Sequence, residues 1–454
     1  MTVESFMAIN DKINGFVWGP VMLVLLVGTG IYLTIRTNFM SIAKLGYIMK
    51  NTFLRMFQKE QVGEGEITAF QAVATALAAT VGTGNIAGVA TAIAVGGPGA
   101  IFWMWLSAIF GMTTKFAEVV LSIQYREKTE DGRFIGGPMH YIANGLNWKW
   151  LATLFALFGA LASFGIGNMT QANSISASME VTFGIPTLVT GIVVAVAAAV
   201  VMLGGIKRIA QVTEMLVPFM AALYIIGGIV ILAINASAIP AAFGLIFKSA
   251  FSGTAAVGGF AGSTIVLASR MGIARGVFSN EAGLGSAPIA HAAATTDHPV
   301  RQGLWGVFEV FMDTIVICSI TALSIIVTGV WNTGESGAAL TTLAFDTSLP
   351  VVGGYIVSIG ILLFAYSTLL SWSYYGERCL EFLFGPKAIT PYRLVFIPFI
   401  VIGAVGGLEV IWDIADTLNG LMAIPNLIGI VGLSGVVIKL TKEFFSTEYV
   451  AEKE

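Results

Sequence analysis

The feature that most constrains the fold of this chain is its series of apolar runs, each about 20 residues long, the length that crosses a bilayer as a helix. Of its 454 residues, 56% are hydrophobic and 11% are charged. A soluble globular protein carries about 25% charged residues. A chain of this size with so few charges could not cover itself with a water-facing surface, so we predict an all-α polytopic membrane protein.

Other properties of the sequence narrow the class further. The net charge of −3 gives no basic surface for a nucleic acid, so we expect no such partner. Both cysteines, Cys318 and Cys379, lie in or beside apolar runs, which argues against a disulfide framework. The first residues lack the basic front of a signal peptide, and we expect a short polar lead-in there.

We expect eleven membrane-spanning helices. Their approximate residues are 16–35, 67–95, 98–124, 150–178, 186–205, 209–235, 250–275, 302–331, 350–378, 391–412 and 416–440. Lysine and arginine set the orientation, since short loops rich in them remain in the cytoplasm. With these spans, all 23 basic residues except Lys12, Lys115 and Lys248 fall on one side. We therefore expect a multi-pass protein of the cell membrane with its N-terminus outside and its C-terminus in the cytoplasm.

Two of the apolar runs carry glycine and polar residues at their centres. The first is LAATVGTGNIAGVATAIAVGG, Leu77 to Gly97, and the second is FSGTAAVGGFAGSTIVLAS, Phe251 to Ser269. Non-helical backbone at membrane depth is tolerated only where it is buried in protein or lines a cavity. Glycine also lets membrane helices pack closely, which is the alternative explanation for either run alone.

The positions of these two runs predict an inverted repeat. They open the second and the seventh span, and the five intervening spans give them opposite orientations in the membrane. Paired glycine-interrupted helices in two inverted halves indicate the binding site of a secondary transporter. We predict an extra N-terminal helix and linker (residues 1–65), two five-helix repeats (66–245 and 246–440), each with an unwound helix, and a cytoplasmic tail (441–454).

A helix break at the first run has defined chemistry. Its first half ends in free carbonyls, and its second half begins with free amides. A zwitterionic amino acid carries the matching charges. Its carboxylate would lie on the amides near Thr83, Gly84 and Asn85, and its ammonium group, or a sodium ion, on the carbonyls from Ala78 to Val81.

Three stretches resemble one known family closely. They are GGPGAIFWMWLSAIFG (Gly96 to Gly111), GGPMHYI (Gly136 to Ile142) and FSNEAGLGSAPIAHAAA (Phe278 to Ala294). They are typical of the alanine/glycine:cation symporters, also called sodium:alanine symporters, of the amino acid–polyamine–organocation superfamily. The resemblance covers nearly the whole chain. It implies sodium-driven uptake of alanine or glycine and a leucine-transporter-type fold with ten core helices.

The resemblance also implies site residues. VGTGN, Val81 to Asn85, resembles the unwound part of the first core helix of that fold. There the amides of Thr83 and Gly84 would hold the substrate carboxylate, and Asn85 would face a second ion or the substrate. The carbonyls of Ala78 and Val81 would bind sodium. FAYSTLLS, Phe364 to Ser371, resembles the eighth core helix, whose Thr368, with Ser367 or Ala365, would complete the sodium site.

Further polar and aromatic residues are candidates for the substrate site. Asn168, Thr170, Gln171 and Asn173 cluster in the fourth span, where Gln171 could bind the charged ends of the substrate or simply bond a neighbouring helix. Phe260, Tyr366 and Trp372 could close a small pocket, or could pack elsewhere. The complete expected substrate set is Thr80, Gly82, Thr83, Gly84, Asn85, Gln171, Gly258, Gly259, Phe260, Tyr366 and Trp372.

Ionisable residues inside the membrane are functional candidates by default. Lys115 and Glu118 are three residues apart on one helix face, so we expect them to neutralise each other. Glu214, Glu309 and Asp313 lie nearer the expected span ends, as gate residues or partners of cytoplasmic arginines. His140, His291 and His298 fall in loop-like stretches without metal-ligand spacing, and we expect them to be solvated or locally hydrogen-bonded.

The coupling ion follows from what the two runs lack. Residues 67–95 and 249–269 contain no Asp, Glu, Lys, Arg or His. A proton-driven carrier needs an ionisable group at its coupling site, so we expect sodium as the coupling ion. We also expect a monomer whose other partners are a small neutral amino acid and the bilayer, with no organic cofactor and no enzymatic activity. The alternatives are a proton-coupled permease of the same fold, a channel, which Thr80 to Gly84 resembles only loosely, and an intramembrane enzyme, for which no catalytic set lies within the spans.

Overall fold

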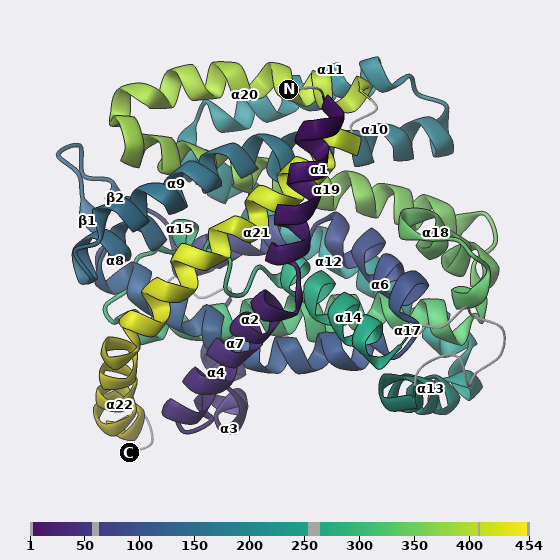
Figure 1. Ribbon diagram of the computed structural model, residues 1–454, viewed down its shortest axis with the longest axis horizontal. Coiled ribbons are helices and arrows are strands. Elements are labelled where there is room, and N and C mark those ends of the chain that lie inside the picture. The colour runs from purple at the N-terminus through teal and green to yellow at the C-terminus, as the bar shows by residue number, and fades with distance from the viewer. Residues whose placement is uncertain (1–2, 57–62, 253–263, 407–408, 452–454) are drawn as a thin grey trace.

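Nearly all of the described chain is helical, as the sequence predicts. The computed structural model describes residues 3–56, 63–252, 264–406 and 409–451 (Figure 1). Within these ranges, the strands β1 (Glu127–Lys128) and β2 (Phe134–Ile135) form one short antiparallel hairpin.

The first half of the chain contains the extra N-terminal helices, a broken helix and four further long helical segments. Its elements are α1 (Val3–Val17), α2 (Pro20–Arg36), α3 (Met40–Ala43), α4 (Leu45–Asn51), η1 (Phe53–Arg55), α5 (Ala69–Thr80), η2 (Gly84–Gly88), α6 (Val89–Gly96), α7 (Ala100–Gln124), α8 (Pro138–Gly145), α9 (Lys149–Phe164), η3 (Gly165–Met169), α10 (Thr170–Phe183), α11 (Thr187–Met202) and α12 (Gly205–Ile234).

The second half repeats this pattern of long helices with short connections. Its elements are η4 (Ala236–Ala238), α13 (Ile239–Ser252), α14 (Ile265–Asn280), α15 (Pro288–His291), α16 (Pro299–Val310), η6 (Phe311–Cys318), α17 (Ser319–Val327), η7 (Val330–Asn332), α18 (Gly337–Ser348), α19 (Val352–Phe384), η8 (Pro386–Ala388), α20 (Ile389–Val405), α21 (Glu409–Gly432) and α22 (Ser434–Ala451). The expected repeat boundary at 245/246 falls within α13, and the expected start of the tail at 441 falls within α22.

The described residues include eight helices that are long and apolar enough to cross a membrane, or nine if one bent pair is a single span. The expected number of eleven is therefore not confirmed. The shortfall has a physical reason, because α11 and α14 have 16 residues each, fewer than the roughly 20 that span the hydrocarbon core.

The bent pair is the first predicted break. Thr68 and Gln71 form a capping box that starts α5, which ends at Thr80. The chain then turns by 49° before the helix resumes at Gly84. Its first turn after the break, η2, is π-helical, a distortion that is frequent at functional sites.

The second predicted break, with Gly258, Gly259 and Phe260, lies outside the described residues. The structure contains a different break 20 residues further along. Helix α14 ends at Asn280, and Glu281, Gly283 and Gly285 have φ of 55°, 93° and 86° before α15 begins at Pro288. This second break lies against the first, since a Cβ added to Gly84 would lie 3.3 Å from the Cα of Ser279.

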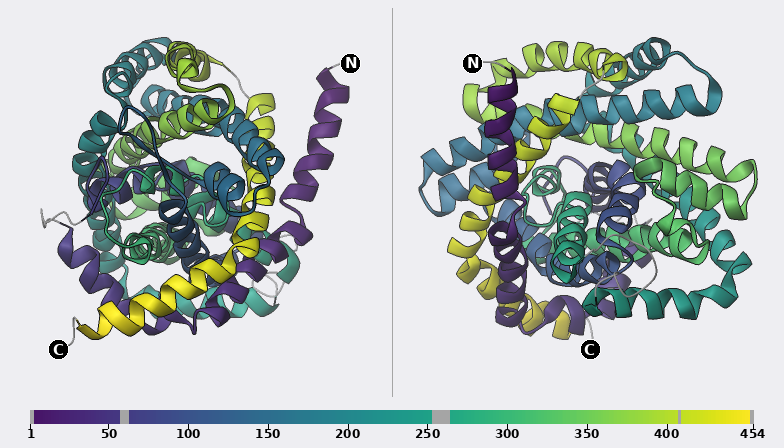
Figure 2. Two further views of the ribbon diagram at one scale, coloured as in Figure 1. Left: turned by 90° about the vertical axis from the view of Figure 1, so that its left-hand side faces the viewer. Right: turned by 45° about the vertical axis from the view of Figure 1, so that its right-hand side comes forward.

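The long helices connect two ends of the molecule. One end carries α13 and α18, and the other carries α8, the β1–β2 hairpin and α22 (Figures 1 and 2). We call them the α18 end and the α8 end. Gly96, at the end of α6, packs on Ala268 and Met271, and Gly99 packs on Ala250. These contacts place the beginning of α14 at the α18 end.

This packing also places two arginines of α14 relative to the second break. Arg270 and Arg275 lie on the half of α14 that leads from the α18 end to the second break, with Lys248 of α13 nearby in the chain. The break described here follows these arginines in the chain, whereas the predicted break precedes them.

Candidate functional site

A small cavity lies between the two breaks. Its volume is about 20 Å³, enough for about one water molecule. Its lining residues come from both breaks and from η3, α10, α19 and α21: Ala79, Thr80, Gly82, Thr83, Gly84, Ile166, Gln171, Phe278, Glu281, Thr368, Trp372 and Asn419. The structure thus brings together six of the predicted substrate residues with Thr368 of the predicted cation site.

Asn85 organises the backbone of the first break. Its Oδ1 accepts a hydrogen bond from the Gly82 N–H at 2.9 Å, and its own carbonyl accepts one from the Thr321 hydroxyl at 2.8 Å. Asn85 is fully buried and is not among the residues that line the cavity, and its hydrogen bonds support the break. The helix restarts at Gly84 beside the cavity, and a helix start has N–H groups without intrahelical partners. An anionic group in the cavity would find these donors.

Hydroxyl and carbonyl oxygens of α5 and α19 converge beside the cavity. Thr368 Oγ1 donates to the carbonyls of Ala78 at 3.0 Å and Ala79 at 3.3 Å, and Ser367 Oγ donates to Ala78 at 3.2 Å. A Cβ on Gly82 would lie 2.6 Å from Thr368 Oγ1, so glycine is required for this approach. Val81 and Ala365 are buried nearby in the chain, and a third hydroxyl, Ser371 Oγ, donates to the Thr75 carbonyl of α5 at 2.7 Å.

Gln171 presents an unused acceptor to the cavity. Its Nε2 donates to the Ile166 carbonyl at 2.9 Å within the π-helical segment η3, and its buried Oε1 has no partner. Asn168 and Asn173 instead donate to backbone carbonyls of α20 and its end. Of these three residues, Gln171 therefore lines the cavity, whereas Asn168 and Asn173 hold neighbouring helices together.

Glu281 is a cavity residue that the sequence analysis missed. It is 4% exposed, and its Oε1 accepts a hydrogen bond from Trp372 Nε1 at 3.0 Å, while its Oε2 accepts one from Ser286. A signal was present in FSNEAGLGS, where an acidic residue precedes two glycines in an otherwise apolar region.

Of the aromatic candidates in the described residues, one lines the small cavity and one does not. Trp372 lines the cavity, and Gly167 lets η3 approach it, because a Cβ there would lie 2.3 Å from the Trp372 Cβ. Tyr366 packs at the edge of the main hydrophobic core and does not line the cavity. Phe278, which we did not predict, takes a place in the wall.

Asp313 connects the two breaks and was placed wrongly by the sequence analysis. It is fully buried in η6, a π-helical segment in the middle of a long helix, and not near a span end. It accepts hydrogen bonds from Asn85 Nδ2 at 2.7 Å, Ser279 Oγ at 3.0 Å and Thr314 Oγ1 at 2.7 Å. The inference that the breaks have no ionisable group is therefore wrong, because Asp313 and Glu281 come from other parts of the sequence.

Lys115 pairs with a different residue from the one expected. Its Nζ lies 3.3 Å from Glu309 Oε1, and both side chains are fully buried. Glu118 instead accepts hydrogen bonds from the Gly283 N–H at 3.0 Å and Asn426 Nδ2 at 2.6 Å. The second break thus takes Glu118 away from Lys115, which spacing along one helix could not reveal.

Two of the histidines are also more buried than expected. His291 is fully buried, with Nε2 3.3 Å from Glu309 Oε2 and Nδ1 2.8 Å from Gln302 Nε2. His140 is buried beside Glu127, and His298 caps α16 through the Val300 N–H. Glu214 is partly exposed on α12.

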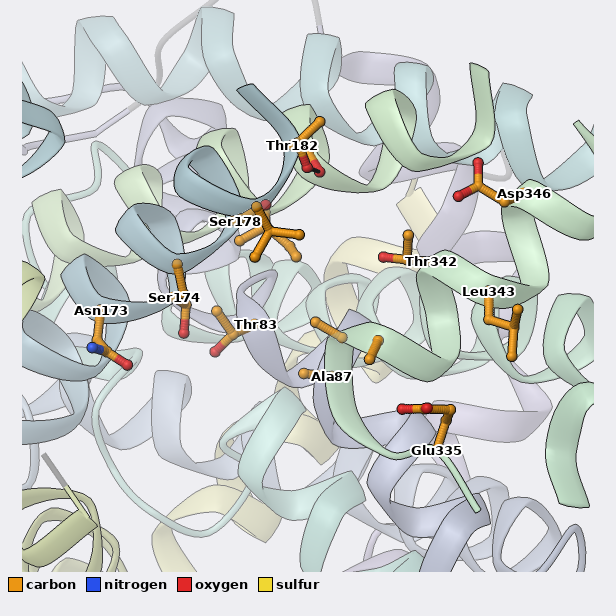
Figure 3. Close-up of a pocket in the computed structure, with 16 residues that line it drawn as sticks. Thr83, Ala87, Asn173, Ser174, Ser178, Thr182, Glu335, Thr342, Leu343 and Asp346 are labelled. Carbon is orange, nitrogen blue, oxygen red and sulfur yellow. Dashed lines mark hydrogen bonds between the residues drawn. The ribbon is translucent and has the colours of Figure 1, made fainter. Parts of the chain in front are cut away.

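A much larger cavity opens from the first break toward the α18 end. Its volume is about 600 Å³, and we call it the vestibule. Figure 3 shows Thr83 and Ala87 of the broken helix facing side chains of α10 and α18 across it. Among the described residues, its lining includes no Lys or Arg, and most of the polar groups are hydroxyls and carboxylates. These polar residues are Thr83, Asn173, Ser174, Ser178, Thr182, Glu335, Thr342, Asp346 and Ser358.

The α8 end is closed by packing and ion pairs. Residues Ala72 to Thr80 of α5 are buried throughout. Arg378 pairs with Glu377 and Glu381, Arg393 with Glu377, and Arg133 with Glu381. The large vestibule lies on the other side of the small cavity, and Thr83 lines both.

Comparison with known proteins gives consistent matches over the whole chain. A model of the sodium:alanine symporter family matches residues 3–454. The sodium/alanine symporter AgcS of Methanococcus maripaludis is 53% identical over 448 residues, which cover 97% of this chain and 97% of that protein. The amino-acid carrier protein AlsT of Bacillus subtilis is 38% identical over 451 residues, which cover 97% of this chain and 93% of that protein.

A solved structure supports the fold independently. The crystal structure of MhsT in complex with L-phenylalanine superposes with a TM-score of 0.58 at 14% sequence identity, covering 83% of this chain and 98% of that chain. At this identity the likeness concerns the fold alone, and it confirms the expected leucine-transporter-type fold.

Proposed function

The chain belongs to the sodium:alanine symporter family, and from this premise we propose that it imports alanine or glycine together with sodium by alternating access. It is a membrane transporter and not an enzyme. The relative AgcS is named as a sodium/alanine symporter, and AlsT as an amino-acid carrier.

The observation that carries the proposal is the small cavity between two helix breaks, with polar groups of opposite character on its walls. The amides at Thr83 and Gly84 suit a carboxylate. Glu281 and the free Oε1 of Gln171 suit an ammonium group. A zwitterionic amino acid provides both. The cavity of about 20 Å³ would have to widen to hold it, and the bulky walls of Ile166, Phe278 and Trp372 favour a small side chain because it needs the least widening.

Sodium is assigned to the oxygens beside this cavity. The carbonyls of Ala78 and Val81 and the hydroxyls of Ser367 and Thr368 are the oxygen ligands that unwound helices supply to sodium in this class of transporter. The hydroxyls now donate to the carbonyls, so binding would turn them to present lone pairs. Ala365 remains a further candidate through its carbonyl.

Alternating access would open the small cavity first to one end of the molecule and then to the other. We assign the α18 end to the outside, because the ion-paired arginines of the α8 end follow the rule that basic residues stay in the cytoplasm. The conformation described here is then open to the outside through the vestibule. The N-terminus lies outside, and the two repeats, 66–245 and 246–440, rock against each other.

A proton-coupled permease of the same fold is the second candidate. Asp313 favours it, because this buried carboxyl group contacts Asn85 at the first break, where proton coupling would need an ionisable residue. We prefer sodium because of the family and the oxygen ligands around Thr368.

Uptake by purified protein in vesicles tests the proposal. Labelled alanine should accumulate only with an inward sodium gradient, and unlabelled glycine should compete better than valine, leucine or glutamate. Accumulation driven by a proton gradient in sodium-free buffer would favour the permease instead. Absence of concentrative uptake under both gradients would reject both candidates.

A further inference from the structure

The buried charges of the described chain do not balance. Apart from the ion pairs around Arg378 at the α8 end, the fully or nearly fully buried charged residues are one lysine and four acids: Lys115, Glu118, Glu281, Glu309 and Asp313. Lys115 pairs with Glu309. The other three carboxyl groups are therefore without a cation of their own among the described residues.

Their hydrogen bonds come from neutral groups. Glu118 accepts from a backbone amide and Asn426, Asp313 from Asn85 and two hydroxyls, and Glu281 from Trp372 and Ser286. An ionised carboxylate that is buried without a cation costs several kcal/mol. A proton, or a positive charge brought by a ligand, would remove this cost.

Glu281 differs from the other two in its access to a ligand. Of these three acids, only Glu281 lines the small cavity. The charged groups that face it are Lys115 of α7 and Glu309 of α16, and the Tyr375 hydroxyl of α19 is the titratable group nearby. Lys115 pairs with Glu309, so the positive charge that acts on Glu281 is shared with another carboxylate.

We propose that Glu281 binds the substrate's ammonium group and a proton in turn, so that the transporter exports one proton for each amino acid that it imports. This inference rests on the proposed function of the small cavity. When the zwitterion enters from the vestibule, the Glu281 carboxylic acid releases its proton to vestibule water, and the carboxylate pairs with the ammonium group. After substrate release inside, a cytoplasmic proton returns to the carboxylate, and the empty carrier crosses back neutral at this position.

The vestibule gives the released proton a polar route. Thr83 belongs both to the small cavity and to the vestibule, whose wall carries Ser174, Ser178 and Thr182 (Figure 3). Proton exchange at Glu281 is coupled to substrate binding and is distinct from sodium binding at Thr368, because the proton and the sodium ion bind to different oxygen atoms.

Vesicles that contain a pH-sensitive dye test the exchange. With an inward sodium gradient and the membrane potential held at zero by valinomycin and potassium, alanine uptake should raise the luminal pH by about one proton per alanine, since one carboxyl group changes protonation state in each cycle. In vesicles preloaded with equal alanine, label should still exchange, but the pH should stay constant, because the carrier crosses loaded in both directions.

The variant Glu281→Gln separates this role from mere support of the fold. It should abolish the pH change and raise the KM for alanine at least tenfold. In the unmodified protein, the apparent KM for alanine should rise about tenfold per unit as the outside pH falls through the titration of Glu281, whereas the KM of the variant should not respond to pH. Glu180→Gln, which changes an exposed acid of α10, is the matched control and should keep both the pH change and the KM.

The outcomes distinguish this inference from the proposed function. Sodium-driven alanine uptake with no luminal pH change overturns the proton exchange and leaves the symport intact. An equal pH change in Glu281→Gln overturns the assignment to this residue. Absence of sodium-driven uptake in the unmodified protein rejects the proposed function itself.

Discussion

Gly82→Ala tests the contact that joins the first break to the predicted sodium site. The new Cβ would lie 2.6 Å from Thr368 Oγ1, a distance that real Cβ atoms do not tolerate. Thr368 cannot yield easily, because its χ1 is restricted and its hydroxyl is held by the carbonyls of Ala78, Ala79 and Phe364. Overpacking of this kind costs about 1–3 kcal/mol.

If that cost falls on the sodium-bound state, the sodium concentration for half-maximal alanine uptake should rise roughly 5- to 150-fold, since 1.4 kcal/mol corresponds to about tenfold. The assay is initial uptake against sodium concentration in vesicles, with the melting temperature of the purified protein as a check of folding. Gly88→Ala is the matched control in the same helix, because a Cβ there meets nothing within 4 Å. Equal sodium dependence of the two variants would refute the reasoning.

Three further changes test the network around the small cavity. Trp372→Phe removes the donor to Glu281 Oε1 and should raise the KM for alanine about tenfold, as expected for a hydrogen bond to a charged group; an unchanged KM would contradict the contact. Lys115→Met leaves Glu309 buried without its cation and should lower the free energy of unfolding by about 3–5 kcal/mol, seen as a lower melting temperature that Lys115→Met with Glu309→Gln partly restores. Gln171→Leu removes the free acceptor and should weaken alanine uptake more than Asn173→Leu does, because the Asn173 amide donates to a backbone carbonyl of α20. A larger loss of uptake in Asn173→Leu would remove Gln171 from the site.

The first break could be predicted because its information is local. Thr80 to Asn85 combine glycine and polar side chains inside an apolar run, and no bilayer-exposed helix needs that pattern. The pairing of this segment with Thr368 could be predicted as well, but only through the resemblance to a known fold. Ser367 and Thr368 do contact the Ala78 carbonyl.

The second break could not be located by the same reasoning. Two glycine-rich stretches follow each other, 251–269 and 281–287, and the sequence does not say which one meets the first break. Packing decides it, since Ser279 at the end of α14 lies against Gly84. Asp313 was also misassigned, because it lies well inside the helix Pro299–Val327, and its partners Asn85 and Ser279 come from other parts of the sequence.

The sequence by itself determined that this chain is an all-helical membrane protein with an interrupted first core helix. The reason is that the length of an apolar run, its low charge and the glycines inside it can all be read from one continuous segment. The tertiary structure alone decided which side chains share the cavity. Glu281 comes from the second break, Gln171 from α10 and Trp372 from α19, which are far apart in the sequence, and Lys115 pairs with Glu309 instead of its neighbour Glu118. Such partners depend on how whole helices pack, because a charge is buried where another helix supplies a counter-charge or a hydrogen-bond donor. The spacing of residues along one helix does not contain that information.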